Sequence, residues 1–231
     1  MFHKKAPCVA ALILFMAVSG VWAGDTASFV DLGFSPDGRT YMFGQYGVQS
    51  RTLKPWAELF IVDVPHNNFV SGGRFSYVYD TPVVSGQNGS GALYRLIAQN
   101  AALAEKYKIN YCFQSQPLFV AVDSTVPNAP IQFRDFESGA NYKASLVSFV
   151  EGQGASLASS FYINLEKTAK DGSIKTYTVG TPSIKRPQVV SYQIQKAMIA
   201  PRDGSMIFLI EMKVQDGGEY NIRYMIEALR I

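Results

Sequence analysis

The chain has 231 residues, of which 48% are hydrophobic and 17% are charged, and its formal net charge is +3. Its lysines and arginines form no block that would follow a phosphate backbone, so nucleic acid is not an expected partner. Of the two cysteines, Cys8 lies in an apolar amino-terminal segment and only Cys112 lies beyond it, which excludes an intramolecular disulfide in the processed chain. Burial of apolar side chains must therefore hold the fold.

The first 23 residues have the pattern of a secretory signal peptide. Lys4 and Lys5 form a basic start, residues 6–18 are almost all apolar, and Ala23 precedes Gly24 at a site suited to cleavage. The apolar run is shorter than the roughly 20 residues of a membrane span, and no later segment resembles one. We expect export to the periplasm or the medium, and a mature chain with 19 basic and 18 acidic residues.

Residues 24–231 are expected to form a single β-rich domain of antiparallel sheets, in a sandwich-like or partial-propeller arrangement. Short apolar or alternating runs, bounded by residues that favour turns, indicate the strands. The expected strands cover residues 40–46, 57–64, 74–79, 118–123, 131–136, 142–151, 156–168 and 174–179. Because breakers are dense in residues 65–90, we expect mostly loop there.

One amphipathic helix is predicted near residues 91–107. Its apolar residues recur at spacings of three and four, and Ser90 is placed to cap its first turn. The loop of residues 86–91 leads into this helix and could hold an anion on its amides. It lacks the lysine and hydroxyl residue of a phosphate loop, so a flexible helix entry is the preferred interpretation.

Three Asp-Gly pairs are predicted to close tight turns, because glycine takes the positive φ that such turns need. The pairs are Asp37-Gly38, Asp171-Gly172 and Asp203-Gly204. The surroundings of the first and third pairs are also alike, since residues 198–208 parallel residues 32–43. Residues 220–229 likewise parallel the strand expected around Leu59, so the chain contains an internal repeat.

The segment Ser35-Pro36-Asp37-Gly38-Arg39, followed by Glu58 to Asp63, resembles one blade of the propeller repeats of Tol-system periplasmic proteins. Asp37 and Asp203 are too far apart for neighbouring blades, which repeat about every 40 to 45 residues, so a full propeller is not expected. Through residues 33–39, 43–47 and 58–64 the chain is also similar to a family of predicted secreted bacterial proteins of unknown function. That resemblance implies export and common ancestry, and it implies no activity.

Candidate catalytic and metal-binding residues are few. His66 is the one histidine of the mature chain and stands in a predicted turn without spaced partners, so neither a zinc site nor a catalytic triad is expected. Cys112 lies between Tyr111 and Phe113 and is expected to be a buried thiol rather than a reactive one. We nominate no catalytic, cofactor-binding or metal-binding residue and expect no cofactor.

Carboxylates and aromatic rings keep two further functions open. A glycosidase needs only two converging carboxylates, but the sequence does not show whether any pair converges among Glu58, Asp63, Glu211, Glu219 and Glu227. Aromatic residues are frequent in the amino-terminal third and are interpreted mainly as core or cross-strand pairs. Rings exposed on a sheet would leave a binding role open.

We therefore favour a non-enzymatic exported module that binds an envelope protein or a glycan. The alternatives are a carboxylate-dependent glycan hydrolase and a carrier of a small apolar ligand.

Overall fold

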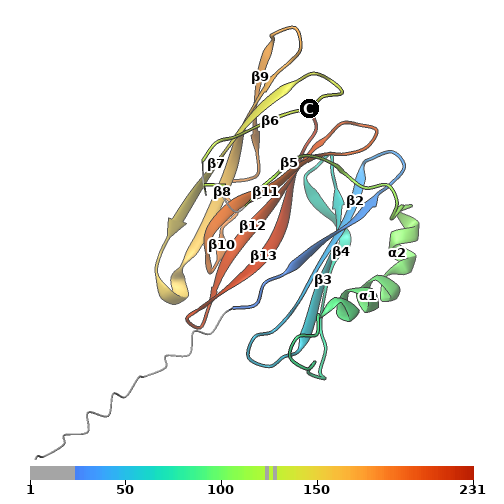
Figure 1. Ribbon diagram of the computed structural model, residues 1–231, viewed down its shortest axis with the longest axis vertical. Coiled ribbons are helices and arrows are strands. Elements are labelled where there is room, and N and C mark those ends of the chain that lie inside the picture. Colours follow the sequence, from blue (N-terminus) through green and yellow to red (C-terminus); the bar gives the residue numbers. More distant parts are fainter. Residues whose placement is uncertain (1–23, 123–124, 127–128) are drawn as a thin grey trace, which may run out of the picture.

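The computed structural model describes residues 24–122, 125–126 and 129–231 (Figure 1). The expected signal peptide and its last residue, Ala23, lie outside the described residues, as does Asp123 at the end of an expected strand. Gly24 is the first described residue.

The strands form three antiparallel sheets (Figure 1). The first sheet has the order β1-β2-β3-β4, with β1 (Ser28–Phe34), β2 (Thr40–Val48), β3 (Pro55–Asp63) and β4 (Asn68–Val78). The outer sheet has the order β10-β8-β7-β6, with β9 also paired to β8; it contains β6 (Ile131–Arg134), β7 (Asn141–Glu151), β8 (Ala158–Thr168), β9 (Ile174–Val179) and β10 (Arg186–Pro187). The central sheet has the order β13-β12-β11-β5, with β5 (Gln116–Val120), β11 (Val189–Ile199), β12 (Met206–Asp216) and β13 (Glu219–Leu229). The prediction of a mainly β, antiparallel fold is confirmed.

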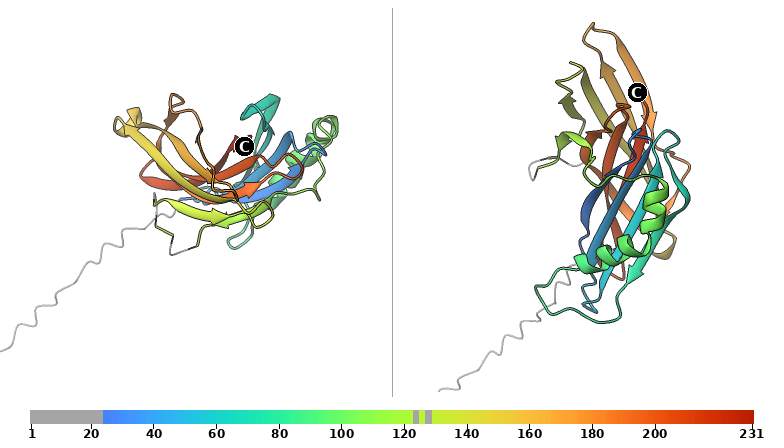
Figure 2. Two further views of the ribbon diagram at one scale, coloured as in Figure 1. Left: turned by 90° about the horizontal axis from the view of Figure 1, so that it is seen from above. Right: turned by 90° about the vertical axis from the view of Figure 1, so that its right-hand side faces the viewer.

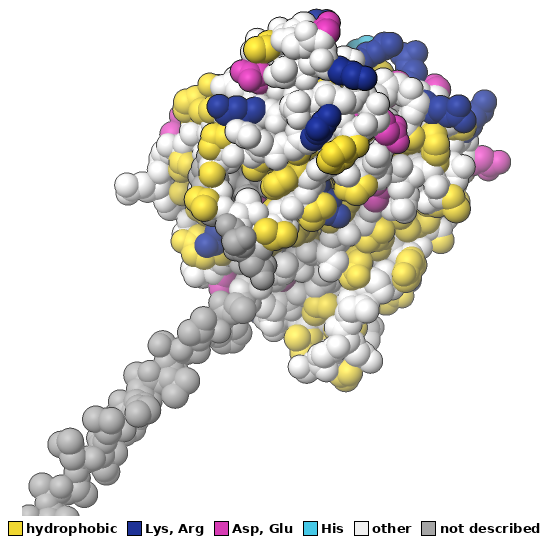
Figure 3. Space-filling model, turned by 45° about the horizontal axis from the view of Figure 1, so that its top comes forward, with side chains coloured by type: hydrophobic (Ala, Val, Ile, Leu, Met, Phe, Trp, Pro, Cys, Tyr) yellow, Lys and Arg dark blue, Asp and Glu magenta, His cyan; other side chains and the backbone are white. Residues whose placement is uncertain are grey.

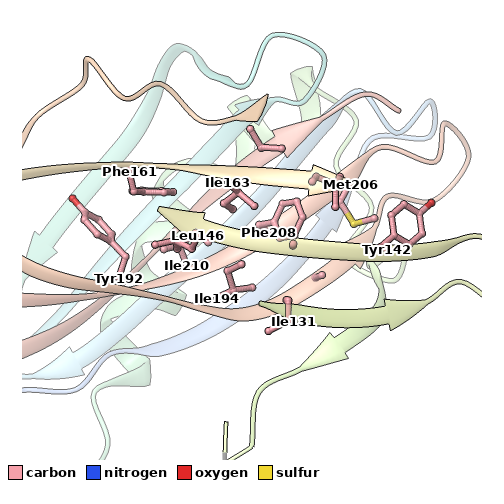
Figure 4. Packing of buried hydrophobic residues seen from close by; sticks show 14 of the residues in the cluster. Ile131, Tyr142, Leu146, Phe161, Ile163, Tyr192, Ile194, Met206, Phe208 and Ile210 are labelled. Carbon is pink, nitrogen blue, oxygen red and sulfur yellow. The ribbon is translucent and has the colours of Figure 1, made fainter. Parts of the chain in front are cut away.

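The central sheet is buried on both faces, and the sequence of β12 shows why. Its run Met206 to Ile210 is continuously apolar, as a strand covered on both sides requires, rather than alternating. Met206, Phe208 and Ile210 enter the core shared with the outer sheet (Figure 4), whereas Ile207 and Leu209 enter the core shared with the first sheet. The sheets are therefore stacked as in a sandwich with an additional layer.

Helices α1 (Ser90–Gln99) and α2 (Ala101–Lys106) cover the remaining face of the first sheet (Figure 1). Leu93 and Leu96 of α1 pack with Leu59 and Ile61 of β3 in a third core. Gly44 allows this close approach, because a Cβ atom there would lie only 2.6 Å from a methyl group of Leu93.

The internal repeat corresponds to two three-stranded meanders, β1-β2-β3 and β11-β12-β13. Their first turns meet, since a Cβ atom on Gly38 would lie 2.5 Å from the carbonyl oxygen of Pro201. The apolar faces of the two meanders share one core, which includes Phe34, Phe43 and Ile207. The repeated pattern thus describes two halves of one packed unit.

Two expectations about secondary structure need correction. Strand β4 begins at Asn68 rather than near residue 74, because a bulge, where the pairing register shifts between Phe60 and Val62, accommodates its glycines. The expected helix is divided at Asn100, whose side-chain amide donates to the carbonyl oxygen of Leu96 at 2.8 Å.

Cys112 is exposed, contrary to the expectation of a buried thiol. It lies in the turn that follows α2, where its backbone N–H donates to the side-chain oxygen of Asn110 at 3.0 Å. The neighbouring ring of Phe113 packs against the core, whereas Tyr111 is 43% exposed. The apolar neighbours in sequence therefore do not share one environment.

A candidate binding groove along strand β13

A groove of about 650 Å³ runs beside β13, within the range of about 300 to 1,000 Å³ typical of ligand sites. Strands β3 and β4 form one wall, β13 and the end of β12 form the floor, and residues 181–189 form the other wall. When the molecule is viewed from above, the two sheets that flank the central sheet diverge on one side of the molecule (Figure 2). The lining of the groove mixes apolar side chains with fixed polar groups.

Strand β13 is an edge strand of the central sheet, and a buried glutamine satisfies part of its free edge. Gln45 is 1% exposed and accepts a hydrogen bond from the backbone N–H of Tyr224 at 2.7 Å. Its side-chain N–H group donates to the backbone oxygen of Tyr224 at 3.2 Å and to Glu58 Oε2 at 2.6 Å. One side-chain amide thus replaces a neighbouring strand at this position.

Asn67 has the same role four positions further along β13. Its side-chain oxygen accepts a hydrogen bond from the backbone N–H of Ala228 at 2.7 Å. Its side-chain N–H group donates to Glu227 Oε2 at 2.5 Å. Asn67 lies in the turn between β3 and β4 with a φ of 47°, a left-handed conformation that asparagine tolerates well.

Glu227 is a buried carboxylate at the same end of the groove. Arg186 on β10 donates to Glu227 Oε1 at 3.2 Å, and its guanidinium lies 4.8 Å from the ring centre of Phe161. Burial raises the pKa of Glu227, against the opposing effects of the Asn67 hydrogen bond and the Arg186 charge. The ion pair between Arg186 and Glu227 ties the segment of residues 181–187 to β13.

Glu58 is the only other expected carboxylate that lines the groove. The remaining three lie elsewhere: Asp63 contacts His66 at 2.9 Å, Glu211 accepts from Gln195 at 2.8 Å, and Glu219 accepts from Arg51 at 3.1 Å. Burial also raises the pKa of Glu211. The structure therefore brings two of the five candidate carboxylates to one groove.

Two arginines flank the groove in different electrostatic settings. Arg223 of β13 forms two hydrogen bonds with Asp25, at 2.7 and 3.0 Å, and its guanidinium lies 3.9 Å from the ring centre of Trp56. Arg74 of β4 lies 5.0 Å from the ring centre of Phe69 and has no carboxylate partner among the described residues. Arg74 therefore forms no ion pair at the β4 wall, and the carboxylate residue next to it in register is Glu58, two positions before its partner Phe60.

The three Asp-Gly pairs lie in turns, away from the groove. Asp37 Oδ1 accepts from the Ser35 hydroxyl at 2.6 Å and from the Arg39 N–H at 3.1 Å, and these hydrogen bonds lower its pKa. Asp171 accepts from Ser173, and Asp203 accepts from Ser205, in similar arrangements. Gly38, Gly172 and Gly204 all have positive φ.

The loop of residues 86–91 lies outside the groove. Ser90 is the first residue of α1 rather than its cap, and its hydroxyl donates to the side-chain oxygen of Asn88 at 2.6 Å. Among the described residues, no cluster of histidine, cysteine and acidic side chains is suited to a metal ion. Within that same part of the chain, every helix is too short or too polar to cross a bilayer.

Residues 42–230 match the family described as "Predicted secreted protein (DUF2259)". The chain belongs to this family. No curated protein and no solved structure matches it. The family description supports export and leaves the compartment, periplasm or medium, open.

Every residue that lines the groove lies inside the range shared with the DUF2259 family. The segment of residues 33–39, on which part of the expected resemblance rested, lies just before that range. Sequence reasoning missed Gln45, Asn67 and Arg186, because nothing in their local sequence distinguishes them from ordinary polar residues. Their role follows from partners more than 40 positions away.

Proposed function

We propose that this protein is a non-enzymatic binding module of the cell envelope or its surroundings, and that the β13 groove is its binding site. The main support is the groove itself, which combines an apolar lining with buried polar groups held by hydrogen bonds. Its size suits a short segment of a protein or glycan. The family description supports an exported location for such a partner.

Trp56 offers a direct readout of binding. It is the only tryptophan of the chain after residue 23, and it contacts Arg223 at the edge of the groove. The probe is anilinonaphthalene sulfonate, an amphipathic anion that accepts energy from tryptophan. We expect saturable quenching of Trp56 with a stoichiometry of one, measured on residues 24–231.

Two matched variants locate that binding. Ile184 lines the groove and is 52% exposed, whereas Ile174 lies on β9 outside the groove and is 62% exposed. Ile184→Asp should weaken quenching about tenfold, because it places a negative charge against the anionic probe, and Ile174→Asp should not. Equal affinities for both variants, or quenching that never saturates, would contradict the proposed site.

A carboxylate-dependent glycan hydrolase is the second candidate, because Glu58 and Glu227 both line the groove and burial raises the pKa of Glu227. The ion pair with Arg186 argues against a free general acid. Gln45 ties Glu58 to Tyr224, whereas Asn67 ties Glu227 to Ala228, four positions further along β13. Turnover of chromogenic glycans that both Glu58→Gln and Glu227→Gln abolish would favour the hydrolase.

A further inference from the structure

The free edge of β13 follows the alternation of an antiparallel ladder. Residues whose backbone groups point away from β12 recur at every second position. At Ile222 both groups pair with the backbone of Asp25 and Ala27, and at Tyr224 both pair with Gln45. At Ala228 the N–H donates to Asn67. Ile226 is the remaining outward position between Gln45 and Asn67.

The backbone N–H and C=O of Ile226 thus point into the groove, and neither has a hydrogen-bond partner among the described residues. Outward positions on a strand are about 6.7 Å apart, so Gln45 and Asn67 leave room for one partner residue. One amino-acid residue in an extended peptide presents its own N–H and C=O on the same side. A peptide residue therefore matches the open position.

The charge of Arg74 on the β4 wall indicates which kind of side chain the peptide places next to it. The other cations of the groove have carboxylate partners: Lys185 pairs with Glu151, Arg186 with Glu227 and Arg223 with Asp25. Arg74 has none among the described residues, and it lies over the 38% exposed ring of Phe69. On the face drawn in Figure 3, lysine and arginine side chains lie mostly towards the top, with aspartate and glutamate side chains among them. An acidic side chain complements this wall.

We propose that the groove binds an extended acidic peptide segment of an envelope protein, with one peptide residue paired to the backbone of Ile226 and a carboxylate at Arg74. This inference rests on the proposed binding function and specifies its ligand. Glu58 lies two positions before Phe60, the register partner of Arg74, and disfavours a second acidic group on that side of Arg74, which sets the direction of the peptide. The paired stretch is limited to one residue, so side chains supply much of the affinity.

The peptide probe is an acetylated and amidated hexapeptide of alternating valine and threonine in which one central threonine is replaced by glutamate, titrated by calorimetry into residues 24–231. A peptide with glutamine in place of glutamate should bind about three- to tenfold more weakly, and one with lysine more weakly still. Arg74→Gln should remove the preference for glutamate. Arg39→Gln, which replaces an exposed arginine outside the groove, should retain it.

Backbone methylation tests the pairing at Ile226. A series of peptides methylated on one backbone nitrogen at a time removes one N–H donor from each. We expect a loss of about tenfold at one position and small losses at the others, because only one residue pairs. Equal effects at all positions, or equal binding of the glutamate and lysine peptides, would overturn the inference.

The two proposals fail in different ways. If anilinonaphthalene sulfonate binds at the groove and none of the peptides binds, the binding site stands and the peptide inference is wrong. If soluble glycan fragments or fatty acids compete with the probe and the peptides do not, the ligand belongs to another class. If neither probe nor peptide binds, both proposals are wrong.

Discussion

Glu227 illustrates how a single residue combines stabilising contacts with an electrostatic cost. Its carboxylate accepts hydrogen bonds from Asn67 and Arg186, yet burial disfavours its charged form strongly enough to raise its pKa above the ordinary value of 4.5. The folded state therefore holds the proton of Glu227 more tightly than the unfolded state does. Its contribution to stability is present below pH 4.5 and is lost as the pH rises through the raised pKa.

We predict that the free energy of unfolding of the wild type, minus that of Glu227→Gln, increases as the pH falls through this window. Urea unfolding at a series of pH values measures the difference, because the glutamine variant lacks the titrating group. Glu166→Gln, at an exposed glutamate of β8, controls for the removal of a negative charge. A difference that decreases on acidification would show that the contacts with Asn67 and Arg186 outweigh burial.

At the scale of elements, the two repeated turns are alike in sequence but differ in surroundings. Gly38 and Gly204 have φ values of 74° and 71°, so alanine is strained at both positions. A Cβ atom at Gly38 would also lie 2.5 Å from the carbonyl oxygen of Pro201, whereas nothing lies within 4 Å of one at Gly204. Of the two glycines, only Gly38 lies in close contact with the facing turn.

We expect Gly204→Ala to lower the free energy of unfolding by about 1–2 kcal/mol through backbone strain. Gly38→Ala should cost about 1–3 kcal/mol more, because the backbone of the facing turn must also shift. Thermal and urea unfolding of the two variants provide the comparison. Equal losses would mean that the turns separate without cost and that the meanders are held together elsewhere.

At the scale of the whole molecule, the central sheet links two cores, and we propose that residues 24–231 unfold as one domain. Ile163 of β8 is 0% exposed in the outer core, remote in sequence from Trp56 of the first sheet. Ile163→Ala should lower the free energy of unfolding by about 2–5 kcal/mol, as for other buried isoleucines. In a single cooperative unit, Trp56 fluorescence and far-ultraviolet circular dichroism report the same loss.

Ile174→Ala is the matched control, because Ile174 is 62% exposed on the same sheet and should change stability by less than about 0.5 kcal/mol. If Ile163→Ala shifts the circular dichroism transition and leaves that of Trp56 in place, the outer sheet unfolds separately. The chain would then contain two cooperative units.

Local patterns in the sequence predicted many of the strands, although the expected strands did not include β1 or β11. The alternation of Phe161, Ile163 and Leu165 with polar residues predicts β8, because that strand has one face on a core and the other exposed. The glycines inside β4 and the division of the helix at Asn100 were not predictable in the same way. A bulge and a helix break depend on neighbouring strands and on packing, which override local preference.

The sequence by itself determined the fold class and the expectation of export, because these depend on neighbours in the chain. Only the tertiary structure decided that β13 is an edge strand, and that Gln45 and Asn67 satisfy that edge from 179 and 161 positions away. It also decided that Glu58 and Glu227, rather than the other carboxylates, share a groove. The physical reason is that a backbone donor or acceptor at a sheet edge takes whichever partner the stacking of layers brings to it.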